Sequence, residues 1–155
     1  MITPDRKIRK AVAAIIHSHG KYLLAQRVKM LTKDRVLVPT VPEWDLVKGG
    51  MEFGESSKEA ILRELYEETG SKAYTIIKQF PETIDFDFPV HLREKIGFDA
   101  QQTTVFLVDF KADIETLQSH DNEIGSYIFV TKEELLQRII LPETQTFIGK
   151  HLREI

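Results

Sequence analysis

Two short apolar runs near the start of the chain predict an antiparallel β-hairpin. Val12–Ile16 and Tyr22–Ala25 are apolar, and the Ser-His-Gly triplet at 18–20 lies between them. Apolar runs of about four to eight residues are typical of buried strands, and small polar residues with glycine favour a turn. The next stretch, Lys29–Glu43, is polar and contains Pro39 and Pro42. It therefore predicts a long loop or an edge strand, where a missing backbone N–H is tolerated.

The segment Ser57–Thr69 has the clearest helical pattern in the chain. Ser56 precedes it and Glu59 follows three residues later, which is the spacing of a capping box. Gly70 stands where a left-handed residue ends many helices. The apolar stripe that predicts its buried face consists of Ala60, Ile61 and Leu65.

The rest of the chain mixes shorter strand and helix patterns. Strands are predicted at Ile76–Phe80, Thr103–Phe110 and Ser126–Val130. A helix is expected to begin after Thr131, with Glu134 completing a second capping box, and a short helix is expected over Thr144–Arg153. Because few regular β-α-β spacings occur, the pattern predicts an α+β fold with a mixed β-sheet and helices packed against it. We expect residues 1–155 to form one domain.

Composition excludes several classes of protein and site. The chain has no cysteine, which excludes disulfides, cysteine zinc sites and a thiol nucleophile. Its net charge of −3 argues against broad adhesion to DNA, RNA or an anionic membrane. No apolar run approaches the roughly 20 residues that span a bilayer. We therefore expect a cytoplasmic protein with no membrane or DNA partner, and the sequence predicts no oligomeric state.

Three glutamates of the predicted helix form a candidate metal site. Spacings of three and four residues place Glu64, Glu67 and Glu68 on one face of the helix. Like-charge pairs at these spacings cost about 0.2–0.5 kcal/mol each on an exposed helix. Arg63 lies four residues from both Glu59 and Glu67 and is expected to offset part of this cost. Oxygen clusters suit Mg²⁺, although glutamate-rich helices are more often simply solvated faces.

Glycines and one more acidic residue precede this helix. Gly49 and Gly50 are expected to adopt backbone conformations closed to other residues, and Gly54 is expected to allow a sharp entry into the helix. Glu55 lies near the helix start, where the helix dipole favours a negative charge, so it is a candidate outer metal ligand.

The whole segment resembles the signature of the Nudix hydrolases, Gly-x5-Glu-x7-Arg-Glu-apolar-x-Glu-Glu-x-Gly. The match falls on Gly49, Glu55, Arg63, Glu64, Leu65, Glu67, Glu68 and Gly70. The apolar position that normally follows holds Ser71 instead, which affects packing after the helix. The resemblance implies the Nudix fold, in which a mixed β-sheet is sandwiched between α-helices.

The resemblance also implies an activity, a cofactor and residue roles. The activity is hydrolysis of a phosphoanhydride bond in a nucleoside diphosphate-linked substrate, with Mg²⁺, or sometimes Mn²⁺, polarising the diphosphate and activating water. Arg63 is expected to orient the glutamates through salt bridges. The implied metal ligands are the carboxylates of Glu64, Glu67 and Glu68, with the Glu55 carboxylate and the Lys48 or Gly49 carbonyl as further candidates.

The later sequence resembles the branch that contains asymmetric diadenosine tetraphosphate hydrolases and bacterial RNA pyrophosphohydrolases. Glu123, four residues before Tyr127, matches a glutamate of that branch and is a candidate metal ligand or general base. His91, Arg93 and Lys95 are candidates for gripping the distal phosphates, with a solvated loop as the alternative. Tyr127 is a candidate for stacking on a base, with core packing as the alternative.

Five hypotheses about function follow, and the last is an interaction module with an accidental acidic helix, which would bind no magnesium and hydrolyse nothing. The first is hydrolysis of a dinucleoside polyphosphate such as diadenosine tetraphosphate. The second is removal of pyrophosphate from an RNA 5′ end, which a basic groove beyond the active site would favour. The third is hydrolysis of nucleoside triphosphates. The fourth, from another class, is a non-catalytic nucleotide sensor, although degenerate glutamates would mark a sensor and all three are present here.

Overall fold

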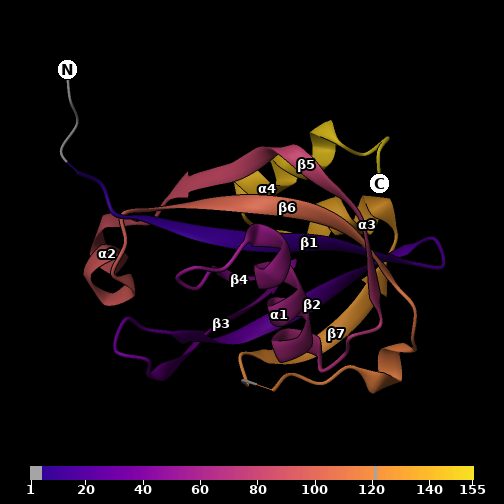
Figure 1. Ribbon diagram of the computed structural model, residues 1–155, viewed down its shortest axis with the longest axis horizontal. Helices are drawn as coiled ribbons and strands as arrows, with labels where there is room; N and C mark the ends of the chain where they lie inside the picture. The colour runs from indigo at the N-terminus through magenta and orange to yellow at the C-terminus, as the bar shows by residue number, and fades with distance from the viewer. Residues whose placement is uncertain (1–4, 121) are drawn as a thin grey trace.

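A computed structural model describes residues 5–120 and 122–155 and contains one mixed sheet with helices (Figure 1). The elements, in chain order, are β1 (Ile8–Ser18), β2 (Lys21–Leu31), β3 (Leu37–Asp45), β4 (Val47–Gly50), α1 (Ser57–Thr69), β5 (Tyr74–Asp87), α2 (Val90–Ile96), β6 (Ala100–Phe110), the 3-10 turn η1 (Ile114–Thr116), β7 (Ile124–Val130), α3 (Lys132–Arg138) and α4 (Pro142–Lys150). No helix within the described residues is long and apolar enough to span a membrane.

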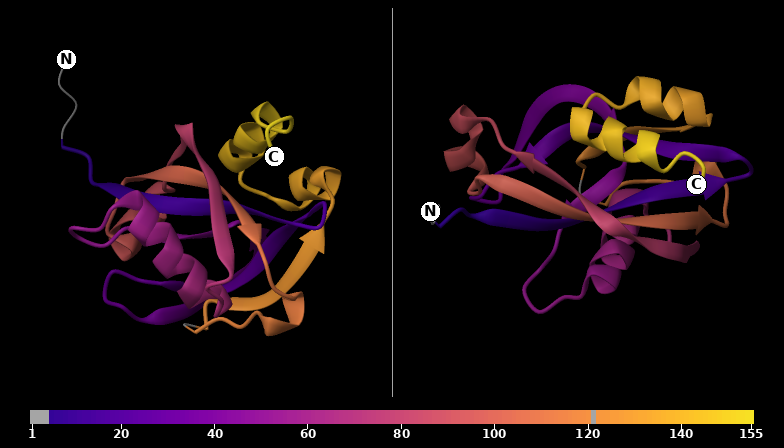
Figure 2. Two further views of the ribbon diagram at one scale, coloured as in Figure 1. Left: turned by 45° about the vertical axis from the view of Figure 1, so that its right-hand side comes forward. Right: turned by 90° about the horizontal axis from the view of Figure 1, so that it is seen from above.

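Helices cover both faces of the sheet, as Figure 2 shows in its view from above. On one face, Ile61 and Leu65 of α1 pack against alternate residues of β1. On the other face, α3 and α4 contribute Leu135 and Ile148 to a second core. Successive side chains of a strand point to opposite faces, so β1 supplies both cores. The predicted α+β sandwich with a mixed sheet is confirmed.

The topology of the sheet opens a space beside its centre. β1 pairs in parallel with β6, and it pairs with β2 only at His17↔Tyr22 and Ser18↔Lys21. Away from this turn the same edge of β1 pairs with β4 over Ala11–Ala14, while β2 continues between β3 and β7. Because β1 and β2 separate after the hairpin, residues of both strands can line a groove between them.

The local patterns near β1, β2 and α1 were predicted well. The hairpin forms, and α1 has the predicted bounds, with the Ser56–Glu59 capping box and a left-handed Gly70 at φ 71°. The edge-strand alternative for the proline-containing stretch is confirmed, because β3 lies at the end of the sheet.

Other parts of the prediction need correction. β5 has 14 residues and extends well beyond the predicted Ile76–Phe80. α4 begins at Pro142 and ends at Lys150, so it is shifted from the predicted Thr144–Arg153. Neither β4 nor α2 was predicted. These elements depend on partners distant in sequence: β4 is four residues long and pairs with β1, and α2 has no buried residue that would mark an apolar stripe.

Candidate active site

Three glutamates of α1 and a fourth, immediately before β7, line a groove of about 1300 Å³. Glu64 and Glu68 are 7% and 1% exposed, whereas Glu67 is more accessible to solvent. Glu123 precedes β7 and lines the same groove, together with the backbone of β4 at Gly49. The structure therefore brings the four predicted glutamates to one groove.

Arg63 forms hydrogen bonds with several carboxylates at one end of this groove. Its Nε and Nη2 atoms donate to the two oxygens of Glu55 at 2.7 and 2.9 Å, a bidentate pair. Nη1 donates to Glu64 Oε1 at 2.8 Å and to Glu67 Oε2 at 3.1 Å, and Nη2 also donates to the Gly50 carbonyl at 2.8 Å. The predicted role of Arg63 in orienting the glutamates agrees with these contacts.

Two expectations about this network change. Glu59 does not pair with Arg63, because its carboxylate accepts a hydrogen bond from the Ser56 N–H in the capping box. Glu55 binds Arg63 with both oxygens and also accepts from the Glu52 N–H at 2.9 Å. The Arg63 guanidinium holds the pKa of Glu55 below its usual range. Glu55 is absent from the groove lining, so it contacts the arginine and not the space in which a ligand would bind.

Gly49 is required by a close approach and not by its backbone conformation. An ideal Cβ on Gly49 would lie 2.1 Å from the Glu64 carboxyl carbon, and one on Gly50 would lie 2.8 Å from Arg9 Nη2. Neither glycine has a positive φ, whereas Gly54 does, at 78°. The expectation that Gly49 and Gly50 adopt special conformations is therefore wrong: they make room for side chains, and only Gly54 makes the expected turn.

Burial controls the charge of Glu64. Desolvation raises the pKa of Glu64 to about 7, and Arg63 opposes that rise through its hydrogen bond and positive charge. The negative charges of Glu67 and Glu123 act in the same direction as burial. A second positive charge near this carboxylate would favour its ionised form.

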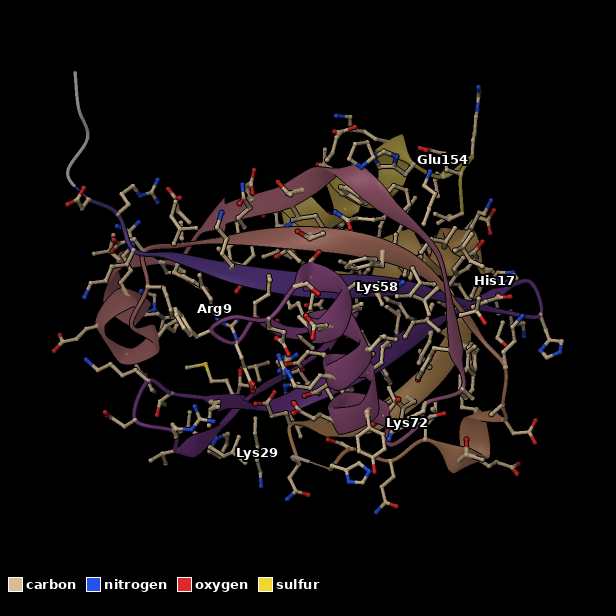
Figure 3. The ribbon with its side chains drawn as sticks, in the orientation of Figure 1. Arg9, His17, Lys29, Lys58, Lys72 and Glu154 are labelled. Atoms are coloured by element: carbon tan, nitrogen blue, oxygen red, sulfur yellow. The ribbon has the colours of Figure 1, made fainter. Side chains whose placement is uncertain are left out.

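Two arginines near the glutamates were not predicted. Arg27 Nη1 pairs with Glu123 Oε2 at 2.8 Å, and its Nη2 lies 3.4 Å from the Lys48 carbonyl oxygen. Arg9 Nη1 donates to Gln101 Oε1 at 2.7 Å, and burial lowers its pKa. Figure 3 shows the Arg9 side chain beside the loop that leads to α1. Both arginines flank apolar strand segments in the sequence, a pattern that could have placed them at the rim of the sheet.

Arginine side chains form ion pairs with the carboxylates that a metal ion would need. Within residues 5–120 and 122–155, no three acidic or histidine side chains stand close enough together to hold one metal ion. Glu64 and Glu67 face Arg63, and Glu123 faces Arg27. The donor set still suits a hard cation, because it consists of carboxylate oxygens beside backbone carbonyls.

The predicted substrate-binding residues are divided. Arg93 lines the groove and donates from Nε to the Phe88 carbonyl at 2.9 Å. His91 and Lys95 are exposed on α2 and do not line the groove. Tyr127 also lies outside the lining, where its ring packs against the α1 side of the core and its hydroxyl donates to the Glu68 carbonyl. Tyr127 therefore packs in the core, which was the alternative to its stacking on a base.

The end of the groove farthest from α1 is built from three distant segments. We call it the distal arm and define it by Lys7, Lys33, Arg35, Phe88, Arg93 and Phe98, all of which line the groove. The arm joins the start of β1, the loop between β2 and β3, and the region of α2, which lie at one end of the molecule (Figure 1). The groove thus has an acidic end and an end that carries cations and aromatic rings.

Comparison with known proteins identifies the family. Residues 7–150 match the NUDIX domain, so the chain belongs to the Nudix family. It is 35% identical over 136 residues to an RNA pyrophosphohydrolase of a Nitratiruptor species, covering 86% of this chain and 84% of that protein. The chain is therefore a Nudix hydrolase that acts on acid anhydrides.

Solved structures show the same fold. The MutT protein from Methanosarcina mazei Go1 aligns with a TM-score of 0.73 and 24% identity, covering 98% of each chain. A Caenorhabditis elegans Ap4A hydrolase in a binary complex aligns with a TM-score of 0.69 and 19% identity, covering 94% of this chain and 96% of that one. At these identities the two structures support the fold and not a substrate.

Proposed function

We propose that this hydrolase removes pyrophosphate from the 5′ end of triphosphate-ended RNA. The observation that carries the proposal is the groove, which continues from the glutamates of α1 into the cationic and aromatic distal arm. An RNA pyrophosphohydrolase that is 35% identical to this chain supports it. RNA thereby moves ahead of dinucleoside polyphosphates, which were the first hypothesis from the sequence.

The glutamates of α1 fit a divalent cation, which Nudix hydrolases generally need. Glu64, Glu67 and Glu68 would hold Mg²⁺, or Mn²⁺ as the alternative, beside the carbonyls of Lys48 and Gly49. When bound, the ion polarises phosphate oxygens and makes water a better nucleophile. Glu55 and the Gly50 carbonyl anchor Arg63 from behind, so it stays beside the glutamates whichever oxygens the cation takes.

The remaining charged groups of the groove have roles that follow from their positions. Arg9 is a partly buried cation hydrogen-bonded to the neutral Gln101 side chain, so it is suited to bind a phosphate oxygen of the substrate. Arg27 holds Glu123 in place from the neighbouring strand. Glu123 is the proposed general base or further metal ligand. In the reaction, water attacks phosphorus and the phosphoanhydride bond between the α- and β-phosphates breaks. The products are pyrophosphate and an RNA with a 5′-monophosphate.

The direct test is product analysis with a 5′-triphosphate oligoribonucleotide and Mg²⁺. We expect the wild type to release pyrophosphate and 5′-monophosphate RNA, and Glu67→Gln to lose at least about 10- to 100-fold in turnover, the loss typical of disrupting groups around a catalytic metal. Glu59→Gln is the matched control on the same helix, because glutamine also completes a capping box. It is expected to keep wild-type turnover.

Other outcomes would redirect the assignment. If the wild type leaves the RNA intact but cleaves diadenosine tetraphosphate, the first sequence-based hypothesis replaces this one. If it cleaves neither substrate but cleaves nucleoside triphosphates, the third hypothesis takes its place. A chain that binds nucleotides and hydrolyses none of these would be a sensor.

A further inference from the structure

We infer that the distal arm is a binding channel for the single-stranded RNA that follows the 5′-terminal nucleotide. This inference rests on the proposed function and adds to it a second contact region, separate from the glutamates that carry the chemistry. The arm would bind the sugar-phosphate backbone with its cations and the bases with its aromatic rings.

The size of the groove is the first observation. Its volume of about 1300 Å³ exceeds the roughly 300–1,000 Å³ typical of small-molecule pockets. The acidic end and Arg9 are enough to contact a triphosphate and its nucleotide, so the distal arm remains for more of the substrate. A polymer that continues beyond its first nucleotide would fill that space.

The charge of the arm is the second observation. The cations of the arm are Lys7, Lys33, Arg35 and Arg93, and the carboxylates that line the groove near them are Asp5, Glu94 and Asp99. Asp99 accepts a hydrogen bond from the Lys7 backbone N–H at 2.9 Å. Among the residues that the structure describes, Lys33, Arg35 and Arg93 form no ion pair. Cations that are not held in an ion pair can neutralise phosphates of a bound strand.

The aromatic side chains are the third observation. Phe88 and Phe98, the two aromatic residues of the arm, line the groove. Phe88 forms an edge-to-face pair with Phe86, which also lines the groove, with ring centroids 5.3 Å apart. A cationic groove with aromatic rings is the arrangement by which proteins bind single-stranded nucleic acid, since bases stack on the rings while the cations follow the backbone.

The segments that carry the arm are held against one another. The Lys33 N–H donates to the Lys95 carbonyl at 3.2 Å, and a Cβ on Gly97 would lie 3.2 Å from Lys33 Cβ. The Asp99 N–H donates to the Lys7 carbonyl at 2.8 Å, which joins α2 and its following turn to β1. These contacts fix the spacing of cations that lie far apart in the sequence.

The test compares RNA with a mononucleotide in a charge-reversed variant. Lys33 and Arg35 are exposed, so Lys33→Glu combined with Arg35→Glu is expected to fold normally. For a 5′-triphosphate octaribonucleotide we expect KM to rise by about 10-fold or more, with a salt slope lowered by about 0.7 for each lost phosphate contact. For the nucleoside triphosphate of the same first base, kcat/KM should change by less than about 2-fold.

A matched control uses cations outside the groove. Lys21 and Lys72 are exposed and do not line the groove, and Figure 3 shows Lys72 on the far side of α1 from Arg9. Lys21→Glu combined with Lys72→Glu makes the same change in net charge. It should leave KM for RNA within about 2-fold of wild type if the arm, and not overall charge, binds the strand.

Failure of the channel can be told from failure of the proposed function. Binding of a 3′-fluorescent RNA with a 5′-hydroxyl, measured by anisotropy, reports on the arm without any chemistry. Loss of this binding in the Lys33/Arg35 variant supports the channel even if the wild type does not hydrolyse triphosphate RNA. Unchanged binding and KM for RNA in that variant, or an equal loss for RNA and mononucleotide, would overturn the channel whatever the catalytic activity.

Discussion

At the scale of single residues, the acidic end of the groove depends on one close approach. The backbone of Gly49 touches the Glu64 carboxylate, and Arg63 fixes that carboxylate from the other side. A side chain at position 49 would therefore act on the chemistry through Glu64. The same principle explains why two adjacent glycines occur in the segment before α1.

Gly49→Ala should disturb the site directly. The added methyl group would overlap the Glu64 carboxyl carbon at 2.1 Å, so Glu64 must leave its contact with Arg63. We expect a loss of roughly 10- to 100-fold in kcat and a loss of about 1–3 kcal/mol in the free energy of unfolding. Steady-state kinetics and urea denaturation measure the two effects.

Gly149→Ala provides the control for this substitution. Gly149 lies in α4 with no atom within 4 Å of an added Cβ. Because alanine has the higher helix propensity, this variant should be neutral or more stable by up to about 1 kcal/mol, with unchanged kcat. Wild-type kcat in Gly49→Ala would contradict the proposed position of Glu64 at the reaction centre.

Sequence alone predicted the acidic residues of the site and Arg63, but not the two arginines that other strands contribute. Glu64, Glu67, Glu68 and Arg63 lie within one local pattern, so helix periodicity was enough to place them together. Arg9 and Arg27 come from different strands, and they meet the glutamates only because β1 and β2 separate after their hairpin. His91 and Lys95 were wrongly grouped with Arg93, since the short helix α2 turns them away from the groove.

At the scale of elements, the helices and strands that depend on residues within their own segment were predicted better than those that depend on distant partners. α1 was predicted to the residue because its capping box and C-terminal glycine act within the segment itself. β4 could not be predicted, because Val47–Gly50 contains two glycines and becomes a strand only by pairing with β1. β5 was underestimated because most of its residues alternate between partial burial and exposure along a sheet edge.

A partly buried tyrosine, Tyr74, joins β5 to the end of α1, and its pKa leads to a prediction about the pH dependence of stability. The Tyr74 hydroxyl lies 2.6 Å from Thr69 Oγ1, and burial raises the pKa of Tyr74 to about 12. A raised pKa means that the unfolded state loses this proton first. The contribution of Tyr74 to stability is therefore complete below its unfolded pKa of about 10 and is lost as pH rises toward 12.

Comparison with Tyr74→Phe isolates this effect. The difference in Tm between wild type and variant should be constant from pH 7 to about 9 and should shrink between about pH 10 and 12. Thermal unfolding followed by circular dichroism across that range measures it. A difference that stays constant to pH 12 would show that Tyr74 is not held protonated by the fold.

At the scale of the whole molecule, the distribution of charge matters more than its sum. The net charge of −3 argued mildly against an RNA substrate. The fold nevertheless collects cations from the start of β1, the β2–β3 loop and α2 at one end of the groove, opposite the glutamates of α1. This separation of charge could not be read from the sequence, because it depends on long-range pairing of these segments.

The preference for triphosphate-ended RNA is tested most directly by the ratio of kcat/KM for two substrates with one enzyme preparation. The substrates are a 5′-triphosphate octaribonucleotide and diadenosine tetraphosphate, both with Mg²⁺ at the same ionic strength. We predict a ratio of about 10 or more in favour of RNA, which corresponds to one additional stacked base or a pair of phosphate contacts. A ratio below one would contradict it and return the dinucleoside polyphosphate to first place.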